Sequence, residues 1–238
     1  MTIWRLTLAS FVLIPGAGGA AWYWHLVVPL ISSAGHEAIA VDLPGPDETA
    51  GLPEYTRLVA AAAGERRDVV LVASSLGAFT APMVAMTVPV TAIVLVNAMI
   101  PVPGETPGAW WDNTGQAQAR VAAAERGGYS ADFDADTYFV HDVPAEVLAS
   151  DREGPRPEAD AVFESACEFS AWPEVPISVV AGAGDRLFPV EFQRRLARER
   201  LGIEADVLPG GHLIALAQPE ALAHYLLMQP GRRGRRTM

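Results

Sequence analysis

Short apolar runs rich in valine and isoleucine alternate along the chain with stretches whose apolar positions recur at helical spacing. Most of these runs are continuous and do not alternate with polar residues. A strand with this pattern is buried on both faces, as in a parallel sheet covered by helices. The predicted strands are Ser10–Ile14, Glu37–Val41, Asp68–Ala73, Ala92–Val96, Ile177–Ala181 and Glu204–Leu208.

Helical stretches lie between most of the predicted strands. Regular alternation of strands and helices is typical of an α/β domain in which helices cover both faces of the sheet. The pattern therefore predicts an α/β fold with a doubly wound, mostly parallel sheet. The helices are expected at Trp22–Ala34, Tyr55–Gly64, Leu76–Met86, Pro189–Arg200 and Glu220–Met228.

One long interval, Ile100–Val175, breaks the alternation. It contains no convincing core strand, and its helical pieces are interrupted by proline and glycine. An insertion of this length between two strands typically lies over the sheet as a lid. We expect a helical cap here; extra helices packed on the side of the sheet are the alternative. The helical pieces are Asn113–Arg126, Pro144–Ala149 and Glu158–Cys167.

The chain length suits a single domain with one insertion. Residues 1–99 and 176–230 are expected to form the core, and residues 100–175 the cap segment. Residues 231–238 contain four arginines and are expected to be a disordered basic tail.

The formal net charge is −11, and all 17 basic residues are arginine. An acidic body repels a phosphate backbone, so we expect a small-molecule substrate and no nucleic-acid partner. Without lysine, the chain can form neither a Schiff base nor a P-loop. Cys167 is the only cysteine, which excludes an internal disulfide, and a passive buried thiol is expected. No metal-ligand spacing is present, so we expect neither metal nor cofactor.

The first residues have some features of a signal peptide, because Arg5 precedes the apolar run Leu6–Ile14. We favour a core strand, since the sheet needs this run, and therefore expect a cytoplasmic protein. No apolar stretch reaches the ~18 residues of a membrane span, so no membrane partner is expected. The sequence does not indicate the oligomeric state.

The clearest chemical motif is Val70–Ala78, where a buried strand leads into a small-x-Ser-x-Gly element and then a helix. This order is typical of a nucleophile elbow, in which a strained turn presents a serine hydroxyl at a helix N-terminus. Ser75 has small residues at both flanking positions, Ala73 and Gly77, whereas Ser74 would have bulky ones. Steric fit therefore indicates Ser75 as the nucleophile.

A serine hydroxyl needs a base to take its proton. Of the five histidines, only His212 lies just beyond the end of a predicted strand, after a Gly-Gly pair that can orient the ring. We therefore predict His212 as the base. His141 lies inside the cap segment and could reach the pocket from above, so it is the second choice.

The base needs a third group that fixes its tautomer. Asp185 follows a predicted strand through a glycine-rich turn, at the sheet edge where parallel α/β sheets bind ligands. The order Ser75, Asp185, His212 is that of the α/β-hydrolase type of triad. The alternatives are that Asp185 caps the helix at Pro189, or that Asp42 is the acid. Asp42 precedes a proline-rich turn, which it more plausibly ties down.

The glycine-rich loop Pro15–Gly19 follows the first strand. Such a loop can direct a backbone N–H at a substrate carbonyl, and we assign the N–H groups of Ala17 and Leu76 as oxyanion donors. The same loop also fits a weak G-x-G-x-x-A dinucleotide pattern, with Asp42 as the acid at the end of the next strand. That interpretation leaves the serine, Asp185 and His212 without a role.

These residues together resemble the α/β-hydrolase superfamily, over about two thirds of the chain. The stretch Leu13–Trp24 resembles the "HGA…W.W" opening of the branch that holds plant methylesterases and hydroxynitrile lyases, and Gly35–Gly45 resembles the strand and turn that follow. Pro15 stands where that branch has histidine, and Ala73 and Ser74 stand where it has Gly-His. Neither departure removes a member of the triad.

The resemblance implies an α/β-hydrolase fold with an inserted helical cap, and cofactor-free hydrolysis of an ester, lactone, amide or C–C bond. The plant lyases of this branch are thought to use a pocket lysine, which this chain lacks, so cyanohydrin cleavage is not expected. Aromatic residues of the cap segment could line an apolar acyl pocket. These are Trp110, Trp111, Phe133, Tyr138, Phe139 and Trp172.

The sequence thus predicts a carboxylesterase-like serine hydrolase that forms an acyl-enzyme on Ser75 and acts on a small, largely apolar ester or lactone. A fold does not fix a reaction, so two alternatives stay open. The first is a non-hydrolytic enzyme of the same fold: a lyase, a cyclase or a cofactor-free oxygenase. The second is a non-catalytic receptor for a small molecule.

Overall fold

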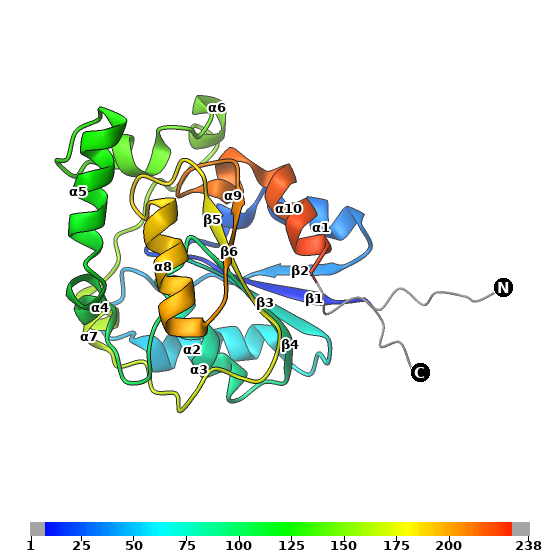
Figure 1. Cartoon of the computed structure of the whole chain (residues 1–238). Helices are drawn as coiled ribbons and strands as arrows, with labels where there is room; N and C mark the ends of the chain where they lie inside the picture. The colour runs from blue at the N-terminus through cyan, green and yellow to red at the C-terminus, as the bar shows by residue number, and fades with distance from the viewer. Residues whose placement is uncertain (1–7, 230–238) are drawn as a thin grey trace, which may run out of the picture.

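The computed structural model describes residues 8–229 (Figure 1). The basic tail predicted at residues 231–238 therefore lies outside the described residues, as does the beginning of the Arg5-led apolar run. Within residues 8–229, no helix is both long enough and apolar enough to cross a bilayer.

The described residues form one six-stranded sheet with the order β2-β1-β3-β4-β5-β6, and every neighbouring pair is parallel. All six predicted strands are confirmed, each end lying within two residues of its expected position. The strands are β1 (Ser10–Ile14), β2 (Glu37–Ala40), β3 (Val69–Ser74), β4 (Val90–Val96), β5 (Ile177–Gly182) and β6 (Ala205–Leu208).

Helices cover both faces of the sheet, so the predicted doubly wound α/β fold is confirmed (Figure 1). Successive residues of β1 point to opposite faces. Val12 and Ile14 pack in the core beneath α2 (Leu52–Ala63), α3 (Thr80–Ala85) and α8 (Val190–Leu201). Phe11 and Leu13 pack against α1 (Val27–Ser33) and α10 (Pro219–Leu227).

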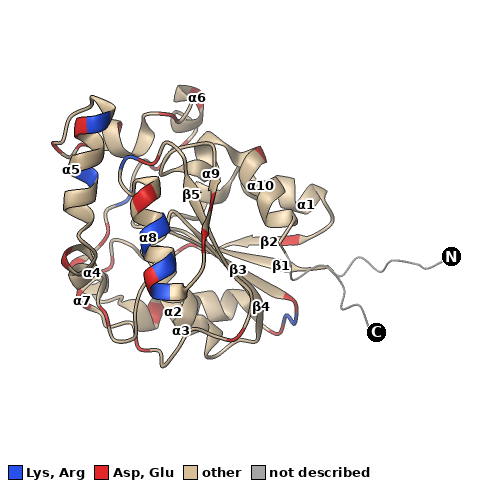
Figure 2. Ribbon diagram, in the orientation of Figure 1, with Lys and Arg blue, Asp and Glu red and all other residues tan. Residues whose placement is uncertain are grey.

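Charged side chains lie on outer helices such as α8 and in the loops that connect the elements (Figure 2). Strands β1, β3, β4 and β5 carry no charged residue. This distribution is the structural basis of the continuous apolar runs in the sequence, because a strand buried on both faces has no solvated side.

Two predicted helices begin later than expected, because each contains a proline. Pro29 and Pro82 lack a backbone N–H, which a helix tolerates only in its first turn. Accordingly α1 and α3 start two residues before Pro29 and Pro82. The residues ahead of them form separate 3₁₀ turns, η1 (Ala21–Trp24) and η2 (Ser75–Phe79).

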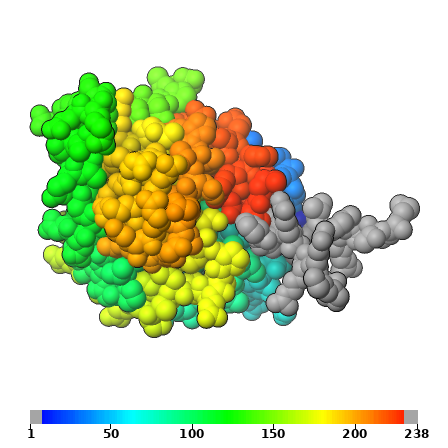
Figure 3. Space-filling model, in the orientation of Figure 1, coloured from blue at the N-terminus to red at the C-terminus, as the bar shows by residue number. Residues whose placement is uncertain are grey.

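Between β4 and β5 the described chain contains helices and no strand. The helix predicted at Asn113–Arg126 is divided at Gly115, whose φ of 64° ends one helix and begins the next. In Figure 3 part of the cap segment, coloured green, lies along one side of the molecule, beside α8. The elements of the cap segment are α4 (Pro107–Thr114), α5 (Gln116–Gly127), the π-helical turn η3 (Asp136–Val140), α6 (Ala145–Leu148) and α7 (Asp160–Glu164).

A buried ion pair fastens the cap segment to the core. Arg200 at the end of α8 binds the carboxylate of Glu105 through both terminal nitrogens, and it also donates to the carbonyl of Ile100 at 2.6 Å. The Glu105 side chain is 2% exposed. Removing one partner of such a buried pair costs about 3–5 kcal/mol, so this contact fixes the start of the cap segment to α8.

Candidate active site

Ser75 is the first residue of η2 and follows β3 directly. Its φ of 49° is unusual for a residue with a side chain, and such strain clusters at functional sites. A Cβ atom on Gly77 would lie 2.4 Å from the carbonyl oxygen of Pro15, and one on Gly16 would lie 3.0 Å from the Cβ atom of Ser75. Only glycine therefore allows the loop after β1 to pass this close to the serine.

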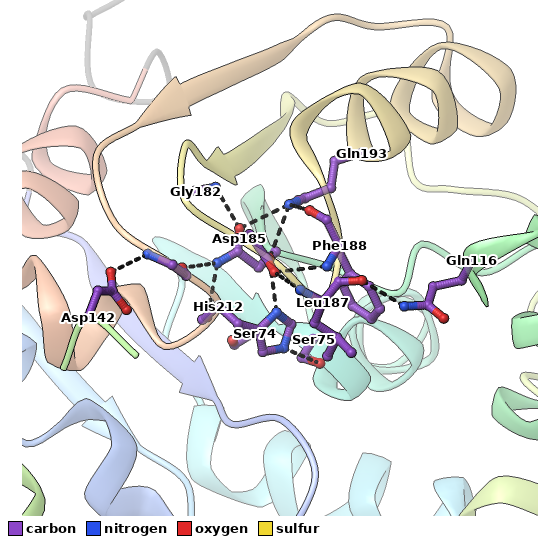
Figure 4. A network of polar contacts seen from close by, with 12 residues as sticks. Ser74, Ser75, Gln116, Asp142, Gly182, Asp185, Leu187, Phe188, Gln193 and His212 are labelled. Atoms are coloured by element: carbon purple, nitrogen blue, oxygen red, sulfur yellow. Dashed lines mark hydrogen bonds and ion pairs between the residues drawn. The ribbon is translucent and has the colours of Figure 1, made fainter. Parts of the chain in front are cut away.

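The two neighbouring serines point to different partners. The hydroxyl of Ser75 lies 3.1 Å from Nε2 of His212. The hydroxyl of Ser74 instead donates to the phenol oxygen of Tyr23, at 3.3 Å. Of the two candidates, Ser75 is thus the one that faces the predicted base (Figure 4).

His212 is held between Ser75 and Asp185. Its Nδ1 atom lies 2.9 Å from Oδ2 of Asp185, and both residues are buried, at 2% and 5% exposure. An ionised carboxylate only accepts hydrogen bonds, so the imidazole proton is on Nδ1. Nε2 is then free to accept the proton of the Ser75 hydroxyl, which is the arrangement a general base needs.

Asp185 is itself held by the backbone. Its Oδ1 atom accepts the N–H groups of Leu187 at 2.9 Å and Phe188 at 2.8 Å. The carboxylate thus closes the turn after β5, whereas helix α8 starts later and has Pro189 at its N-cap. The N-cap alternative for Asp185 is therefore wrong.

Two aromatic rings enclose the imidazole of His212. The ring centroid of Phe139 lies 5.2 Å from it and that of Phe188 lies 5.0 Å from it, both nearly edge-on. Such packing holds the ring plane and keeps water away from the Asp185 side. Phe139 comes from the cap segment, so the cap segment forms part of the wall around the base.

Asn97 was not predicted from the sequence, yet it joins the loops that carry the triad. It follows β4, is fully buried and has a φ of 45°. Its Nδ2 atom donates to the carbonyls of Gly211 and His212, both at 2.9 Å, and its Oδ1 atom accepts the N–H of Gly182 at 2.7 Å. The one signal in the sequence is a polar residue at the end of a central strand, which marks the position but does not identify its partners.

Gln193 on α8 supports the same network from the other side. Its Nε2 atom lies 3.2 Å from Oδ2 of Asp185, 3.2 Å from Oδ1 of Asn97 and 2.7 Å from the carbonyl of Phe188 (Figure 4). The second carboxylate oxygen of Asp185 therefore has a neutral donor besides the histidine. Nothing in the sequence around Gln193 distinguishes it from an ordinary helix residue.

The cap segment binds the loop that carries His212 through Asp142 rather than through His141. Oδ2 of Asp142 accepts the N–H of Gly211 at 2.6 Å. His141 packs against the same glycine, and its Nε2 atom lies 4.0 Å from Oδ1 of Asp142. Among the described residues, no hydrogen bond joins His141 to Ser75, so the second-choice base is not placed for that role.

The residues predicted to donate to the oxyanion lie at the cavity beside Ser75. Ala17 and Leu76 both line the cavity that contains Ser75 and His212. Neither backbone N–H has a hydrogen-bond partner within residues 8–229. The N–H groups are thus available to a bound ligand, while their role as donors stays a prediction.

The dinucleotide interpretation of the glycine-rich loop finds no support at Asp42. Oδ1 of Asp42 accepts the N–H of Ala21 at 3.0 Å, and the carboxylate also pairs with Arg156 of the cap segment. Asp42 thus joins the loop after β1 to the cap segment. The sequence predicted that it ties down the proline-rich turn at residues 44–46, but within residues 8–229 its side chain makes no hydrogen bond to that turn.

A cavity of about 660 Å³ opens over Ser75 and His212. Two of the six predicted cap aromatics, Trp111 and Phe139, line it. Trp110 and Tyr138 are instead fully buried in the core, and Phe133 is exposed. The apolar walls of the cavity are formed mainly by Trp22, Tyr23, Met99, Trp111, Phe139, Val140, Leu148, Phe163, Leu187, Leu213 and Leu216.

The described part of the chain offers neither a metal site nor a reactive thiol. It contains no cluster of three or more His, Cys, Asp or Glu side chains that could hold a metal ion. Cys167 is buried and donates to the carbonyl of Phe79 at 3.0 Å, and burial raises the pKa of its thiol to about 12. A thiol with that pKa is inert at neutral pH.

Residues 11–225 match the model of a family described as the alpha/beta hydrolase family. "Probable esterase PIR7A" of Oryza sativa subsp. indica is 37% identical over 40% of this chain and 41% of its own length. "Norfluorocurarine synthase 1" of a Strychnos species is 38% identical over 29% of this chain and 30% of its own length. The matched stretch thus spans less than half of these curated relatives.

A solved structure covers nearly the whole chain. The pyrethroid hydrolase from Sphingobium faniae superposes with a TM-score of 0.74 and 22% identity, over 93% of this chain and 96% of its own. At this level of identity the likeness shows the fold, which is the α/β-hydrolase fold. Other matches include plant methylesterases, so the resemblance to that branch is confirmed.

Proposed function

We propose that this chain, which belongs to the alpha/beta hydrolase family, is a serine hydrolase that cleaves small, largely apolar carboxylic esters or lactones. The observation that carries the proposal is the hydrogen-bonded series from Ser75 through His212 to Asp185. The esterase name of the rice relative supports ester hydrolysis as the reaction type.

In the first half of the reaction, Oγ of Ser75 attacks the ester carbonyl carbon while Nε2 of His212 takes the hydroxyl proton. The Asp185 carboxylate stabilises the imidazolium that forms. The negative charge on the carbonyl oxygen is stabilised by the N–H groups of Ala17 and Leu76, each such donor typically contributing about 3 kcal/mol.

Collapse of this intermediate breaks the bond to the alcohol oxygen. The imidazolium of His212 protonates the departing oxygen, and the acyl group remains on Ser75. In the second half, His212 takes a proton from water, the hydroxide attacks the acyl carbon, and Oγ of Ser75 leaves and recovers its proton. The balance is one ester and one water consumed, and one alcohol and one acid formed.

The cavity supports the substrate class. Its volume of about 660 Å³ lies in the usual range for small-molecule sites, and its walls are mainly apolar and aromatic. Apolar walls bind an acyl or alcohol group by removing it from water, at about 25 cal/mol per Å² of apolar surface. A small ester with an apolar body fits this environment better than a sugar or a nucleotide.

The test is turnover of p-nitrophenyl butyrate, combined with fluorophosphonate labelling. We expect burst-phase kinetics, a label on Ser75, and a loss of kcat of about 10⁶-fold in Ser75→Ala. Ser74→Ala should still take the label, because the hydroxyl of Ser74 faces Tyr23. Full activity in Ser75→Ala would refute the proposal.

A second candidate is a non-hydrolytic reaction at the same site. One curated relative carries the name of a synthase, and a fold does not fix the chemistry it hosts. This candidate gains support if Ser75 takes the fluorophosphonate label while no ester or lactone from a broad panel is turned over.

A further inference from the structure

A carboxylate from the cap segment binds the loop that carries the oxyanion donor Ala17. Oε2 of Glu158 accepts the N–H of Gly18 at 2.6 Å, and its Oε1 atom accepts a short hydrogen bond from the hydroxyl of Tyr55 on α2. Glu158 and Gly18 are 140 positions apart in the chain. The contact therefore connects the cap segment to the peptide directly after Ala17.

The residues on either side of Glu158 strengthen this attachment. Arg156 binds the carboxylate of Asp42 at 3.0 Å, and Asp42 also accepts the N–H of Ala21. The N–H of Ala159 donates to the carbonyl of Gly45 at 2.7 Å. Residues 156–159, here called the strap, thus lie across the loops that follow β1 and β2.

The loop itself is a tight turn that glycine makes adjustable. The N–H of Gly19 donates to the carbonyl of Gly16 at 3.1 Å, so Ala17 and Gly18 are the two central residues of the turn. Gly18 has a φ of 84°, as the third residue of a type II turn requires. Because glycine tolerates both signs of φ, the central peptide could also adopt the opposite orientation. Only one orientation directs the Gly18 N–H at Glu158.

We propose that Glu158 is a positioning residue for catalysis: by binding the Gly18 N–H, it holds the turn that presents the Ala17 N–H to the oxyanion. This inference rests on the proposed function. Glu158 does not touch the reacting atoms, and it acts through the Gly18 peptide. A misplacement of about 1 Å in such a group can cost about 100-fold in rate.

The chemistry of Glu158 favours this role over simple packing. A partly buried carboxylate is costly unless donors satisfy it, and an apolar side chain would fill the same space at lower cost. Burial raises the pKa of Glu158, while the hydrogen bonds from Tyr55 and Gly18 lower it in part. The nearby arginine, Arg156, pairs with Asp42 and Glu153. The carboxylate is thus held by a backbone N–H and a phenol hydroxyl rather than by a cation.

The experiment compares Glu158→Ala, Glu158→Gln and the control Glu164→Gln with the wild-type chain. Glu164 is exposed at the end of α7, the helix that follows the strap. We expect Glu158→Ala to lower kcat about 10–100-fold, with KM within about threefold, because the defect affects the oxyanion rather than substrate binding. Glu158→Gln keeps an amide oxygen that can accept from Gly18, and it should recover most of that loss.

A trifluoromethyl ketone, which forms an oxyanion on the active serine, gives a second readout. Its Ki should rise in Glu158→Ala by about the same factor as kcat/KM falls, and should change little in the two glutamine variants. Thermal melts establish that the variants are folded. A kcat of Glu158→Ala within about twofold of wild type, in a folded protein, would overturn the proposal.

Hydrogen exchange separates this proposal from the proposed function. The backbone amides of residues 16–20 should exchange faster in Glu158→Ala than in wild type, and at wild-type rates in Glu164→Gln. If wild type hydrolyses no ester, the proposed function fails while exchange still reports on the loop. Unchanged exchange in Glu158→Ala would then refute the positioning role, and faster exchange would support it.

Discussion

Oγ of Ser75 and Nε2 of His212 lie 3.1 Å apart, although the two residues are 137 positions apart in the chain. They meet because β3 and β6 run parallel in the same sheet, so their carboxyl ends are at the same edge. Asp185 follows β5 at that edge and completes the series. The convergence is therefore a property of the strand directions, and side-chain chemistry alone decides what happens there.

Asp185 controls the tautomer of His212, so Asp185→Asn should lower kcat sharply without unfolding the chain. The asparagine amide would donate to Nδ1 and move the imidazole proton to Nε2, which can then no longer act as a base. We expect a fall in kcat of about 10⁴-fold. Hydrolysis of p-nitrophenyl butyrate measures it, with Asp112→Asn, an exposed cap residue, as the control. A loss below about tenfold would show that Asp185 does not orient the base.

Replacing Asn97 tests whether its side chain holds the loops after β5 and β6 in place. Asn97→Ala removes three hydrogen bonds to backbone groups of Gly211, His212 and Gly182, and alanine tolerates a φ of 45° poorly. We expect a loss of about 2–4 kcal/mol in the free energy of unfolding, together with a lower kcat. Urea denaturation and steady-state kinetics measure the two effects.

Asn97→Gly is the matched variant, because glycine adopts this φ without strain. It should recover part of the stability, and the reduced kcat should remain. If Asn97→Gly also had wild-type kcat, the side chain would serve the backbone conformation only and would not position His212.

The sequence predicted the elements of the sheet because burial on both faces leaves a continuous apolar run in each strand. It also indicated Ser75, because the small residues around a nucleophile elbow are local. Two predicted helix starts were wrong, and the reason is also local. Pro29 and Pro82 fit only in the first turn of a helix, so α1 and α3 begin shortly before them. That signal was present in the sequence.

The supporting residues could not be predicted in this way. Asn97, Gln193 and Glu158 contact mainly backbone atoms or carboxylates from distant segments, and a single polar residue carries no sequence pattern that identifies such partners. Glu158 was expected only as the first residue of a cap helix. In the structure it precedes α7 and binds the loop after β1 instead, because the strap crosses that loop before the helix begins.

Glu158 also gives a pH-dependent prediction for stability. Burial raises its pKa in the folded state, so the stability that it contributes is fully present below the ordinary pKa of glutamate and is lost as pH rises through the raised pKa. Glu158→Gln is neutral at every pH and escapes this loss. The Tm of Glu158→Gln relative to wild type should therefore increase between about pH 4 and pH 8.

Glu37 provides a control of opposite sign. Its hydrogen bonds to Arg66 and Ser10 lower the pKa of Glu37 to about 2. Its contribution is therefore present above the ordinary pKa of glutamate and is lost as pH falls. Glu37→Gln should lower stability at neutral pH by at most about 1 kcal/mol, because the pair is exposed. For Glu158 the contradicting result is a Glu158→Gln variant that is less stable than wild type at pH 8 but not at pH 4. The Glu158 carboxylate would then not be destabilised by burial in its charged form.

The charges around the cavity predict a preference among esters. Asp136 and Asp151 line it, and the arginine there, Arg156, already pairs with Asp42 and Glu153. A carboxylate on the substrate therefore meets unbalanced negative charge in a chain whose net charge is −11. We expect kcat/KM for mono-p-nitrophenyl succinate to be about tenfold or more below that for p-nitrophenyl butyrate, which has an acyl chain of equal length.

Two experiments show whether charge repulsion or the apolar walls of the cavity cause the lower kcat/KM of the succinate ester. The difference between the two esters should narrow as ionic strength rises, because screening weakens the repulsion within a Debye length of about 8–10 Å. The double variant Asp136→Asn, Asp151→Asn should narrow it as well, by raising kcat/KM for the succinate ester only. If the difference persisted in both conditions, the cavity would reject the carboxylate through its apolar walls, since an unpaired charge in such walls carries a desolvation cost that neither change reduces.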